Sequence, residues 1–380
     1  MLRSGSALVG NPDASIAAAQ AAAQALAATG AERATAALVF AVGADLDLER
    51  AAAAACEVLG TRAVASARGH GVLAGSCEDE CGPAVAVLAL AGVPGLAFRV
   101  AGPGAEDAIG SEVEAQLGRS PTETNLVVAF ADPLGCDATR LSAALADLQP
   151  ATVAGVGAAL GAGDRPLLAC ADRAVRGGLC GLVLSLDAPA RVAVSQGCRP
   201  ITDPIAVTRV EGNWILELDG KPALDVYREV AREPLAADLR LAAERVLAAL
   251  PRSARHRADS GAAWVARRVA GFAPARRAFA LAESLRVGTV LRFALRDADL
   301  AREDLALALA GVAGPASAGL YLSSSARGRA LFRHSGLESA IVARALAPAP
   351  IAGLFGSFEI APLAGSPELL AHAGILIALP

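Results

Sequence analysis

Lysine is almost absent from this 380-residue chain, since Lys221 is the only one, and aromatic residues make up just 3% of it. The formal net charge is −4, so basic residues do not outnumber acidic ones. A chain with this balance has no overall field that attracts nucleic acid or anionic lipid. We therefore expect neither nucleic acid nor a membrane surface as a partner.

We also expect no secretory signal, because residues 1–10 contain no apolar segment of useful length. The seven cysteines are an odd number and form no dense framework. This pattern predicts reduced thiols and a cytoplasmic location. The uncharged stretch 305–326 is interrupted by Gly311, Gly314, Pro315 and a run of three serines, which favours two buried elements joined by a turn over a membrane span.

What the chain has in abundance is alanine-rich apolar sequence, with 54% hydrophobic and 19% charged residues. Such a chain can bury a large core, and its length favours two domains. The pattern predicts an α/β (α+β) fold, in which mixed β-sheets are covered by helices. A unit of strand, helix, strand, glycine-rich turn and further strand recurs three times, beginning at the expected strands 37–42, 126–130 and 320–322.

The first 33 residues are predicted to be a helical segment, with a helix over 14–29 that Asp13 caps and Gly30 ends. We expect a first domain over 34–205 and a second, related domain over 206–380. The second domain opens with a hairpin, 205–210 and 214–218, followed by a helix after Pro222 and another helix over 239–250. Residues 236–285 of this second domain, which include the second helix, form an arginine-rich segment.

The sequence lacks the residues that several common kinds of metal and cofactor site require. Cys77 and Cys81 are four residues apart, but a zinc site needs two more ligands, and the four histidines are scattered. The glycines at 155, 157 and 161 do not have the offsets of a dinucleotide fingerprint, and there is no phosphate-binding P-loop. We expect no metal and no cofactor.

Three polar islands stand in apolar surroundings after expected strands. The first comprises Ser195, Gly197, Cys198 and Arg199, and the second contains Ser324 and Arg327. Glu359 is the third. Hydroxyl and guanidinium groups suit a carboxylate, and a lone carboxylate must be exposed, paired or facing a ligand. These residues are therefore predicted to bind a small anionic or zwitterionic ligand.

Two alternatives remain open. Arg199 is positioned in sequence to lower the pKa of the Cys198 thiol, which would favour a cysteine-dependent enzyme, although the common interpretation of such a cysteine is a buried structural thiol. The arginine-rich segment would instead favour a protein-interaction module that docks an acidic surface. We expect no catalytic residues, and hence no enzyme.

A set of short motifs is spread over almost the whole length of the chain: Gly69–Gly75, Gly82–Val87, Ala131–Pro133, Ser195–Ile201, Ile215–Leu224, Arg286–Gly288, Leu295–Ala298, Ala326–Phe332 and Ile351–Leu354. In these motifs the chain resembles the FIST family of sensory and signal-transduction proteins. The resemblance implies a FIST N-like domain, a FIST C-like domain and a bacterial-type sensory protein that binds amino acids or similar zwitterions and acts on a signalling partner.

The sequence departs from the family pattern at two of the islands. Ser324 and Ser325 stand where the family usually has cysteine and asparagine, and residues 356–359 read Gly-Ser-Phe-Glu in place of Cys-Asn-Gly-Glu. Only the glutamate of that second motif is kept, at Glu359.

Overall fold

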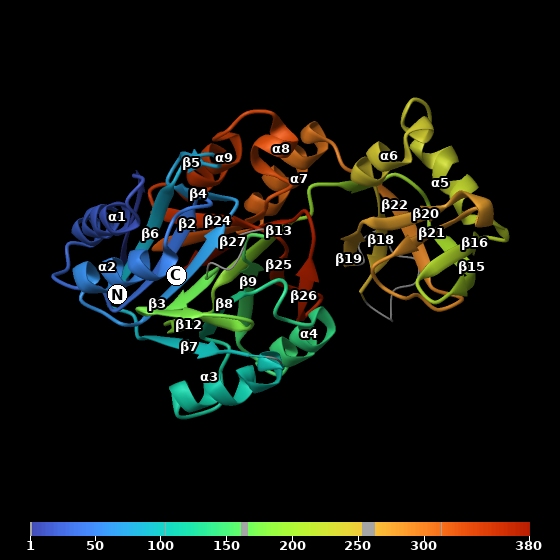
Figure 1. Cartoon of the computed structure of the whole chain (residues 1–380). Helices are drawn as coiled ribbons and strands as arrows, with labels where there is room; N and C mark the ends of the chain where they lie inside the picture. The colour runs from blue at the N-terminus through green and yellow to red at the C-terminus, as the bar shows by residue number, and fades with distance from the viewer. Residues whose placement is uncertain (1, 103, 161–165, 253–262, 313) are drawn as a thin grey trace. The chain divides into compact units, whose positions relative to one another are not determined.

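The computed structural model describes residues 2–102, 104–160, 166–252, 263–312 and 314–380. These form two compact units, with unit 1 comprising residues 1–195 and 306–380 and unit 2 comprising residues 196–305. Both are mixed α/β structures, as predicted (Figure 1). The spatial units differ from the sequence division at residue 205, because C-terminal strands complete sheets that N-terminal strands begin.

The described residues of unit 1 form three six-stranded sheets of the same design. In each sheet a parallel pair of strands is extended on one side by two strands, each antiparallel to its neighbour. The parallel pairs are β2 (Ala36–Val42) with β3 (Val64–Gly69), β8 (Asn125–Ala131) with β9 (Thr152–Gly157), and β23 (Ala318–Ser324) with β24 (Ile351–Gly356). The flanking strands are β6 (Ala84–Ala91) and β1 (Arg3–Gly10), β12 (Leu179–Ser185) and β7 (Gly95–Val100), and β27 (Gly374–Leu379) and β13 (Arg191–Ser195). The threefold pattern in the sequence therefore corresponds to three repeated units.

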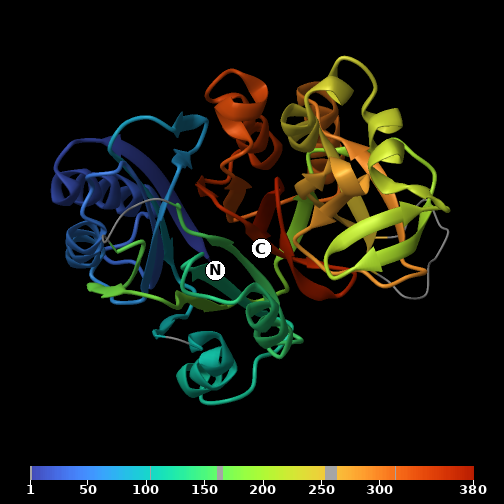
Figure 2. The same cartoon turned by 45° about the vertical axis from the view of Figure 1, so that its right-hand side comes forward.

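Each sheet is completed by a hairpin from another repeat. The hairpin β10 (Leu168–Cys170) and β11 (Arg173–Val175) joins β3, the hairpin β25 (Glu359–Leu363) and β26 (Ser366–Leu370) joins β9, and the hairpin β4 (Gly71–Ala74) and β5 (Cys77–Asp79) joins β24. Each repeat thus gives one hairpin and receives another. Residues far apart in sequence are interleaved in this way, as the mixed colours within the sheets of Figure 2 show.

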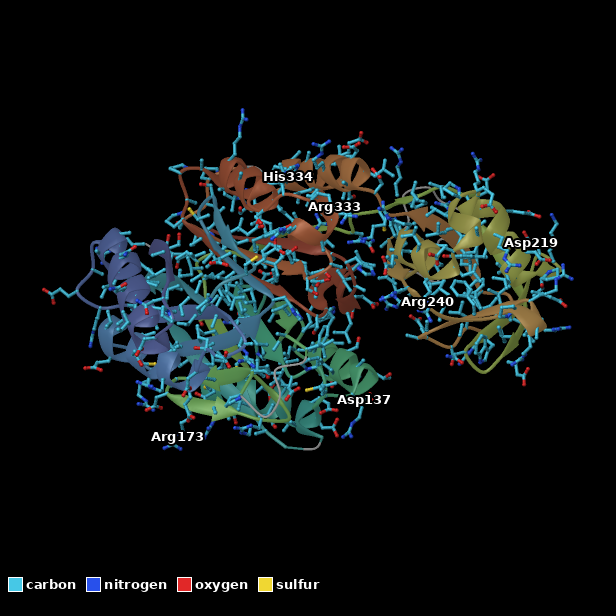
Figure 3. The ribbon with its side chains drawn as sticks, turned by 45° about the horizontal axis from the view of Figure 1, so that its top comes forward. Asp137, Arg173, Asp219, Arg240, Arg333 and His334 are labelled. Atoms are coloured by element: carbon cyan, nitrogen blue, oxygen red, sulfur yellow. The ribbon has the colours of Figure 1, made fainter. Side chains whose placement is uncertain are left out.

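Helices follow or connect these strands. They are α1 (Ala14–Thr29), α2 (Leu48–Leu59), α3 (Ile109–Leu117), α4 (Ala138–Ala146), α7 (Ala298–Ala310), α8 (Gly328–Phe332) and α9 (Leu337–Leu346), with a 3-10 turn η1 at Ala105–Ala108. Asp13 and Gly30 bound α1 as predicted, and Asp137 caps α4 (Figure 3). The strand β1 within the predicted helical segment 1–33 was not foreseen. The stretch 305–326 contains the end of α7 and β23, and no helix in the described part of the chain is long and apolar enough to cross a membrane.

Unit 2 has its own sheet, with nine strands among the residues that the structure describes. Its strands are β14 (Arg199–Pro200), β15 (Ile205–Glu211), β16 (Trp214–Leu218), β17 (Lys221–Pro222), β18 (Val246–Pro251), β19 (Trp264–Arg267), β20 (Val269–Ala273), β21 (Ala278–Leu281) and β22 (Val290–Leu295). Its helices are α5 (Ala223–Ala231) and α6 (Leu239–Arg245), with 3-10 turns η2 (Leu235–Ala237) and η3 (Pro274–Arg276). The ring of Tyr227 packs against Phe272, Phe279 and Phe293 in its core.

Two predictions about local structure were wrong. The helix expected over 239–250 ends at Arg245, and Val246–Pro251 is the strand β18. A short apolar run fits a buried strand as well as a helix, so periodicity alone did not separate them. The glycine-rich turn of the repeated unit was expected at 155–163 in the second copy and at 351–356 in the third. Gly155 and Gly157 instead lie in the buried strand β9, and 351–356 is the buried strand β24; the glycines at 161 and 163 lie outside the described residues.

The glycines in these strands allow three strand ends to meet. Gly69, Gly157 and Gly356 occupy the same register position, at the end of the second parallel strand of each repeat. Backbone hydrogen bonds join the three ends: the N–H of His70 donates to the Phe355 carbonyl at 2.7 Å, that of Ser357 to the Gly157 carbonyl at 2.9 Å, and that of Ala159 to the Arg68 carbonyl at 2.8 Å. A Cβ at Gly69 would lie only 2.5 Å from the Phe355 oxygen.

Replacing Gly356 with alanine is therefore expected to lower the free energy of unfolding by about 1–3 kcal/mol or more. The new Cβ would collide with the Gly157 carbonyl oxygen and with Val156 Cγ2, and neither backbone nor packed side chain can move away freely. Urea unfolding followed by circular dichroism measures the change. Gly110→Ala is the matched control: its Cβ meets no atom within 4 Å in α3, so it should be stabilising by up to about 1 kcal/mol. Equal effects of the two substitutions would contradict this account.

Candidate functional site

Four of the seven predicted site residues come together in unit 1. Ser195 ends β13, Ser324 ends β23, Arg327 precedes α8 and Glu359 begins β25. These positions lie at the carboxyl ends of the parallel strands β23 and β24, the edge at which open α/β sheets usually bind ligands. All four are buried, with exposed fractions of 0–3%.

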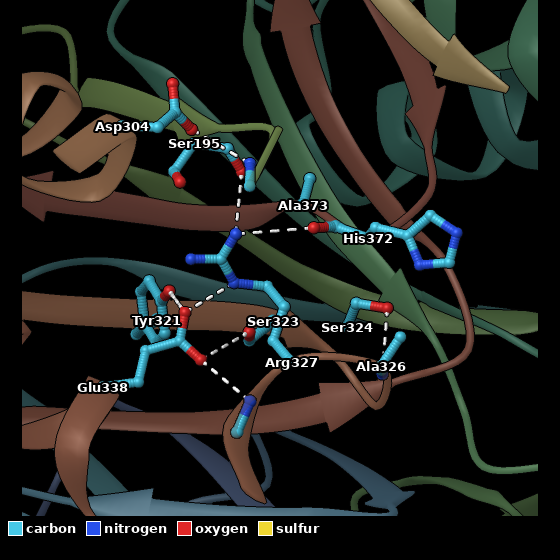
Figure 4. A network of polar contacts seen from close by, with 12 residues as sticks. Ser195, Asp304, Tyr321, Ser323, Ser324, Ala326, Arg327, Glu338, His372 and Ala373 are labelled. Atoms are coloured by element: carbon cyan, nitrogen blue, oxygen red, sulfur yellow. Dashed lines mark hydrogen bonds and ion pairs between the residues drawn. The ribbon is translucent and has the colours of Figure 1, made fainter. Parts of the chain in front are cut away.

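Arg327 is the centre of this buried polar network (Figure 4). Its Nε donates to Oε1 of Glu338 on α9 at 2.5 Å, and both side chains have 0% exposure. Its Nη1 donates to the backbone carbonyls of Ser195 and His372, at 3.5 and 3.4 Å. The guanidinium therefore holds the end of β13 and the loop before β27 against β23.

Glu338 accepts from three further groups. The Tyr321 hydroxyl donates to Oε1 at 2.5 Å, while the Gly328 N–H and the Ser323 hydroxyl donate to Oε2 at 3.2 and 3.4 Å. Burial and the Glu338 carboxylate raise the pKa of Tyr321 well above its usual value, so this phenol stays a hydrogen-bond donor. The carboxylate of Glu338 thus matches the charge of Arg327, as buried ion pairs require.

Glu359 is a second buried carboxyl group in the same network. Its Oε2 accepts from the Ala373 N–H at 2.9 Å, and its Oε1 is buried with no hydrogen-bond partner among the described residues. Burial raises the pKa of Glu359 well above its usual value, although the Ala373 N–H, the charge of Arg327 and the nearby Ser324 hydroxyl all act in the opposite direction. Buried polar atoms are normally hydrogen-bonded, so this oxygen stands out.

The sequence did not reveal Glu338 or Tyr321 as members of the network. Glu338 lies in the first turn of a helix, where acidic residues are common for dipole reasons. Tyr321 lies within an apolar strand and looks like core. Gly374 offers a weak signal, because a Cβ there would collide with the Tyr321 hydroxyl and lie 3.2 Å from Arg327 Nε.

The other three predicted site residues belong to unit 2. The Gly197 N–H donates to Asp304 at 2.9 Å, and Arg199 is exposed and paired with Glu303 at 3.6 Å. Cys198 is 2% exposed within an apolar cluster that includes Leu247 and Ala294. This environment matches the interpretation of Cys198 as a structural thiol and offers no support for a nucleophile, which needs an accessible thiolate.

A second acidic group lies on the hairpin β4–β5 of unit 1. Glu80 accepts from the Arg329 N–H at 2.8 Å and Glu78 from the Gly336 N–H at 2.9 Å, which ties the hairpin to the loops around α8. Burial, and secondarily the neighbouring carboxyl groups of Glu78 and Glu338, raise the pKa of Glu80 to about 7. No group of three or more histidine, cysteine, aspartate or glutamate side chains in the described part of the chain could hold a metal ion.

The arginine-rich segment is partly neutralised within unit 2. Arg252 and Arg267 both pair with Glu283, at 3.0 and 2.9 Å. Arg276 pairs with Glu211 and Arg277 with Asp225. Residues 253–262 of the segment lie outside the described residues.

Family models match most of the chain, the FIST N domain over residues 35–221 and the FIST C domain over 223–362. The chain belongs to the FIST family. The two FIST models meet inside unit 2, so the boundary between the sequence families does not coincide with that between the compact units. FIST domains are associated with sensory and signal-transduction proteins.

This FIST protein is similar to proteins of mycobacteria. An uncharacterized protein of Mycobacterium tuberculosis is 32% identical over 307 residues, which is 78% of each chain. An uncharacterized protein of Mycobacterium bovis is 35% identical over 177 residues, or 45% of this chain and 46% of the relative. Among solved structures, a cyanuric acid hydrolase from A. caulinodans matches 48% of this chain and 70% of its own with 14% identity and a TM-score of 0.29, a likeness too weak to inform fold or activity.

Proposed function

We propose that the protein is a sensory module that binds a small polar metabolite at the buried network of unit 1 and passes the signal to a protein partner. The observation that supports this most directly is the Glu359 carboxyl group. It is fully buried at the carboxyl ends of β23 and β24, and its Oε1 has no hydrogen-bond partner among the described residues. A ligand that donates a hydrogen bond there would complete the network.

Amino acids and similar zwitterions are the ligands that the family resemblance implies, and Glu359 suits their ammonium group. Two of the other predicted ligand contacts, Ser195 and Ser324, lie in the same network, and Arg327 links them. We place Gly197, Cys198 and Arg199 outside the primary site, because they belong to unit 2 and the contacts described above for each of them are with residues of that unit.

A sensory role, rather than catalysis, fits the chemistry of the network. The carboxylate that accepts from the Tyr321 and Ser323 hydroxyls is Glu338, and its buried ion pair with Arg327 makes it a poor general base for activating either hydroxyl as a nucleophile. No disulfide joins any of the seven cysteines, all of which lie among the described residues, and we propose that the protein works in the reducing cytoplasm.

A thermal-shift screen of amino acids, amines and other small polar metabolites at millimolar concentration tests the proposal. A ligand present at 100 times its Kd stabilises the folded protein by about 2.7 kcal/mol, which is a readily measured shift. We expect at least one compound whose shift is lost in Glu359→Gln and kept in Glu123→Gln, a matched change at an exposed glutamate. Shifts that survive in Glu359→Gln, or a screen without any shift, would contradict the proposed site.

A further inference from the structure

The charged groups around Glu359 balance one another without any contribution from Glu359 itself. The charged groups that act on its carboxyl group are Arg327 before α8 and Glu338 on α9. Two further titratable residues belong to the same network: the Tyr321 hydroxyl on β23 donates to Glu338, and the backbone carbonyl of His372 in the loop before β27 accepts from Arg327. Its neighbours on the paired strands, Val156 on β9 and Leu370 on β26, are apolar. Arg327 and Glu338 form one ion pair, so Glu359 is a second acid that has no ion pair of its own among the described residues.

A carboxyl group in such a place can avoid an isolated buried charge in two ways. It can keep its proton, or it can ionise against a cation that enters from outside. Hydrogen bonds distinguish the two oxygens of Glu359: Oε2 accepts from the Ala373 N–H, whereas Oε1 is left for the proton or for the cation. The protein supplies no lysine here, since its only lysine is Lys221 in unit 2.

We propose that the ligand is an organic amine without a carboxylate, and that it binds Glu359 in exchange for a proton. This inference rests on the proposed function and narrows it. The protonated carboxyl group loses its proton to solvent, and the ammonium group of the amine donates to the resulting carboxylate. One positive charge leaves and one enters, so the net charge of the buried network does not change.

The same network should bind an amino acid less tightly than the amine that differs from it only in lacking the carboxylate. Its carboxylate would need a cation, but the Nε and Nη1 donors of Arg327 are directed to Glu338, Ser195 and His372. Capturing Arg327 would leave Glu338 as an uncompensated buried carboxylate, and breaking a buried pair in this way costs several kcal/mol. Arg327 Nη2 is also buried in this network, but a ligand carboxylate held there would share a single positive charge with Glu338. By charge balance, the network therefore discriminates against a second negative charge.

Amines and amino acids that differ only in the carboxylate provide the test. The probes are agmatine with arginine, putrescine with ornithine, ethanolamine with serine, and phenethylamine with phenylalanine, each titrated calorimetrically into the full chain at pH 7. For at least one pair we expect the amine to bind at least about tenfold more tightly than its amino acid, a difference of about 1.4 kcal/mol. The titration is repeated in two buffers of different ionisation enthalpy. If about one proton is released per amine bound, the two binding enthalpies should differ by about the difference between the ionisation enthalpies of the buffers.

The controls separate this inference from the proposed function. Glu359→Gln should abolish amine binding and proton release, while Glu123→Gln should change neither; circular dichroism confirms that both variants are folded. An amino acid that binds as tightly as its amine, in a Glu359-dependent manner, would overturn the inference and leave the proposed function standing. Amine binding without a buffer-dependent heat would overturn the proton exchange, and failure of all four amines to bind at 10 mM, roughly the weak limit of specific binding, would overturn the ligand class.

Discussion

Replacing Arg327 with alanine is expected to lower the free energy of unfolding by about 3–5 kcal/mol. The substitution leaves Glu338 as a buried carboxylate whose remaining donors, the Tyr321 and Ser323 hydroxyls and the Gly328 N–H, are all neutral. It also removes the guanidinium from the Ser195 and His372 carbonyls. Urea unfolding at pH 7 measures the loss of unfolding free energy. The backbone amides at the end of β13 should also exchange their hydrogens faster than in the parent.

A double variant shows whether the loss comes from the unpaired charge. Arg327→Met with Glu338→Leu removes both charges and should be more stable than Arg327→Ala, since a buried ion pair replaced by apolar groups is often close to neutral. Arg173→Ala is the matched control at an exposed arginine and should lie within about 0.5 kcal/mol of the parent (Figure 3). A cost below about 1 kcal/mol for Arg327→Ala would show that the network does not support the sheet ends.

Part of the site was predictable from the sequence because polar residues that follow apolar strands meet where those strands end. Ser324 ends β23, Arg327 follows it and Glu359 follows β24, so the parallel pairing of the two strands brings these residues together. Ser195 joins them because β13 and β23 both pair with β27. The α/β class and the family were predictable for a similar reason, since both depend on local patterns that recur along the chain.

The remaining features depend on contacts that leave no local trace. Glu338 pairs with Arg327 across the turn between α8 and α9, and nothing in the helix 337–346 marks it as a buried partner. The exchange of hairpins among the three repeats is likewise invisible in a pattern of strands and helices. The glycines at 69, 157 and 356 were misleading, because a glycine that permits close strand contact looks in sequence like one that permits a turn.

The strand order of the three repeats explains why unit 2 can be inserted into the third of them. In the first two repeats the outer strand, β1 or β7, leads directly to a helix and then to the first parallel strand. In the third repeat unit 2 intervenes between β13 and β23. An insertion at a strand end disturbs no ladder hydrogen bond, so the third sheet keeps the design of the other two.

Replacing Glu359 with glutamine is expected to make the ligand-free protein more stable at neutral and alkaline pH. Burial raises the folded-state pKa of Glu359 above its unfolded value of about 4.3, so its contribution to stability is fully present below that pH and is lost as the pH rises towards the folded-state pKa. The parent therefore loses about 1.4 kcal/mol for each pH unit over this range, whereas the glutamine variant does not. Urea unfolding at pH 4, 6 and 8 gives the difference between the two proteins.

The difference should grow from pH 4 to pH 8, and Glu123→Gln should show none. Glu80, whose pKa is raised to about 7, titrates in both proteins and cancels in the comparison. A pH-independent difference, or a glutamine variant less stable than the parent at pH 8, would mean that Glu359 is ionised and compensated within the protein. A carboxyl group that costs stability in the free protein is typical of a functional position, because strain of this kind is removed when the ligand binds.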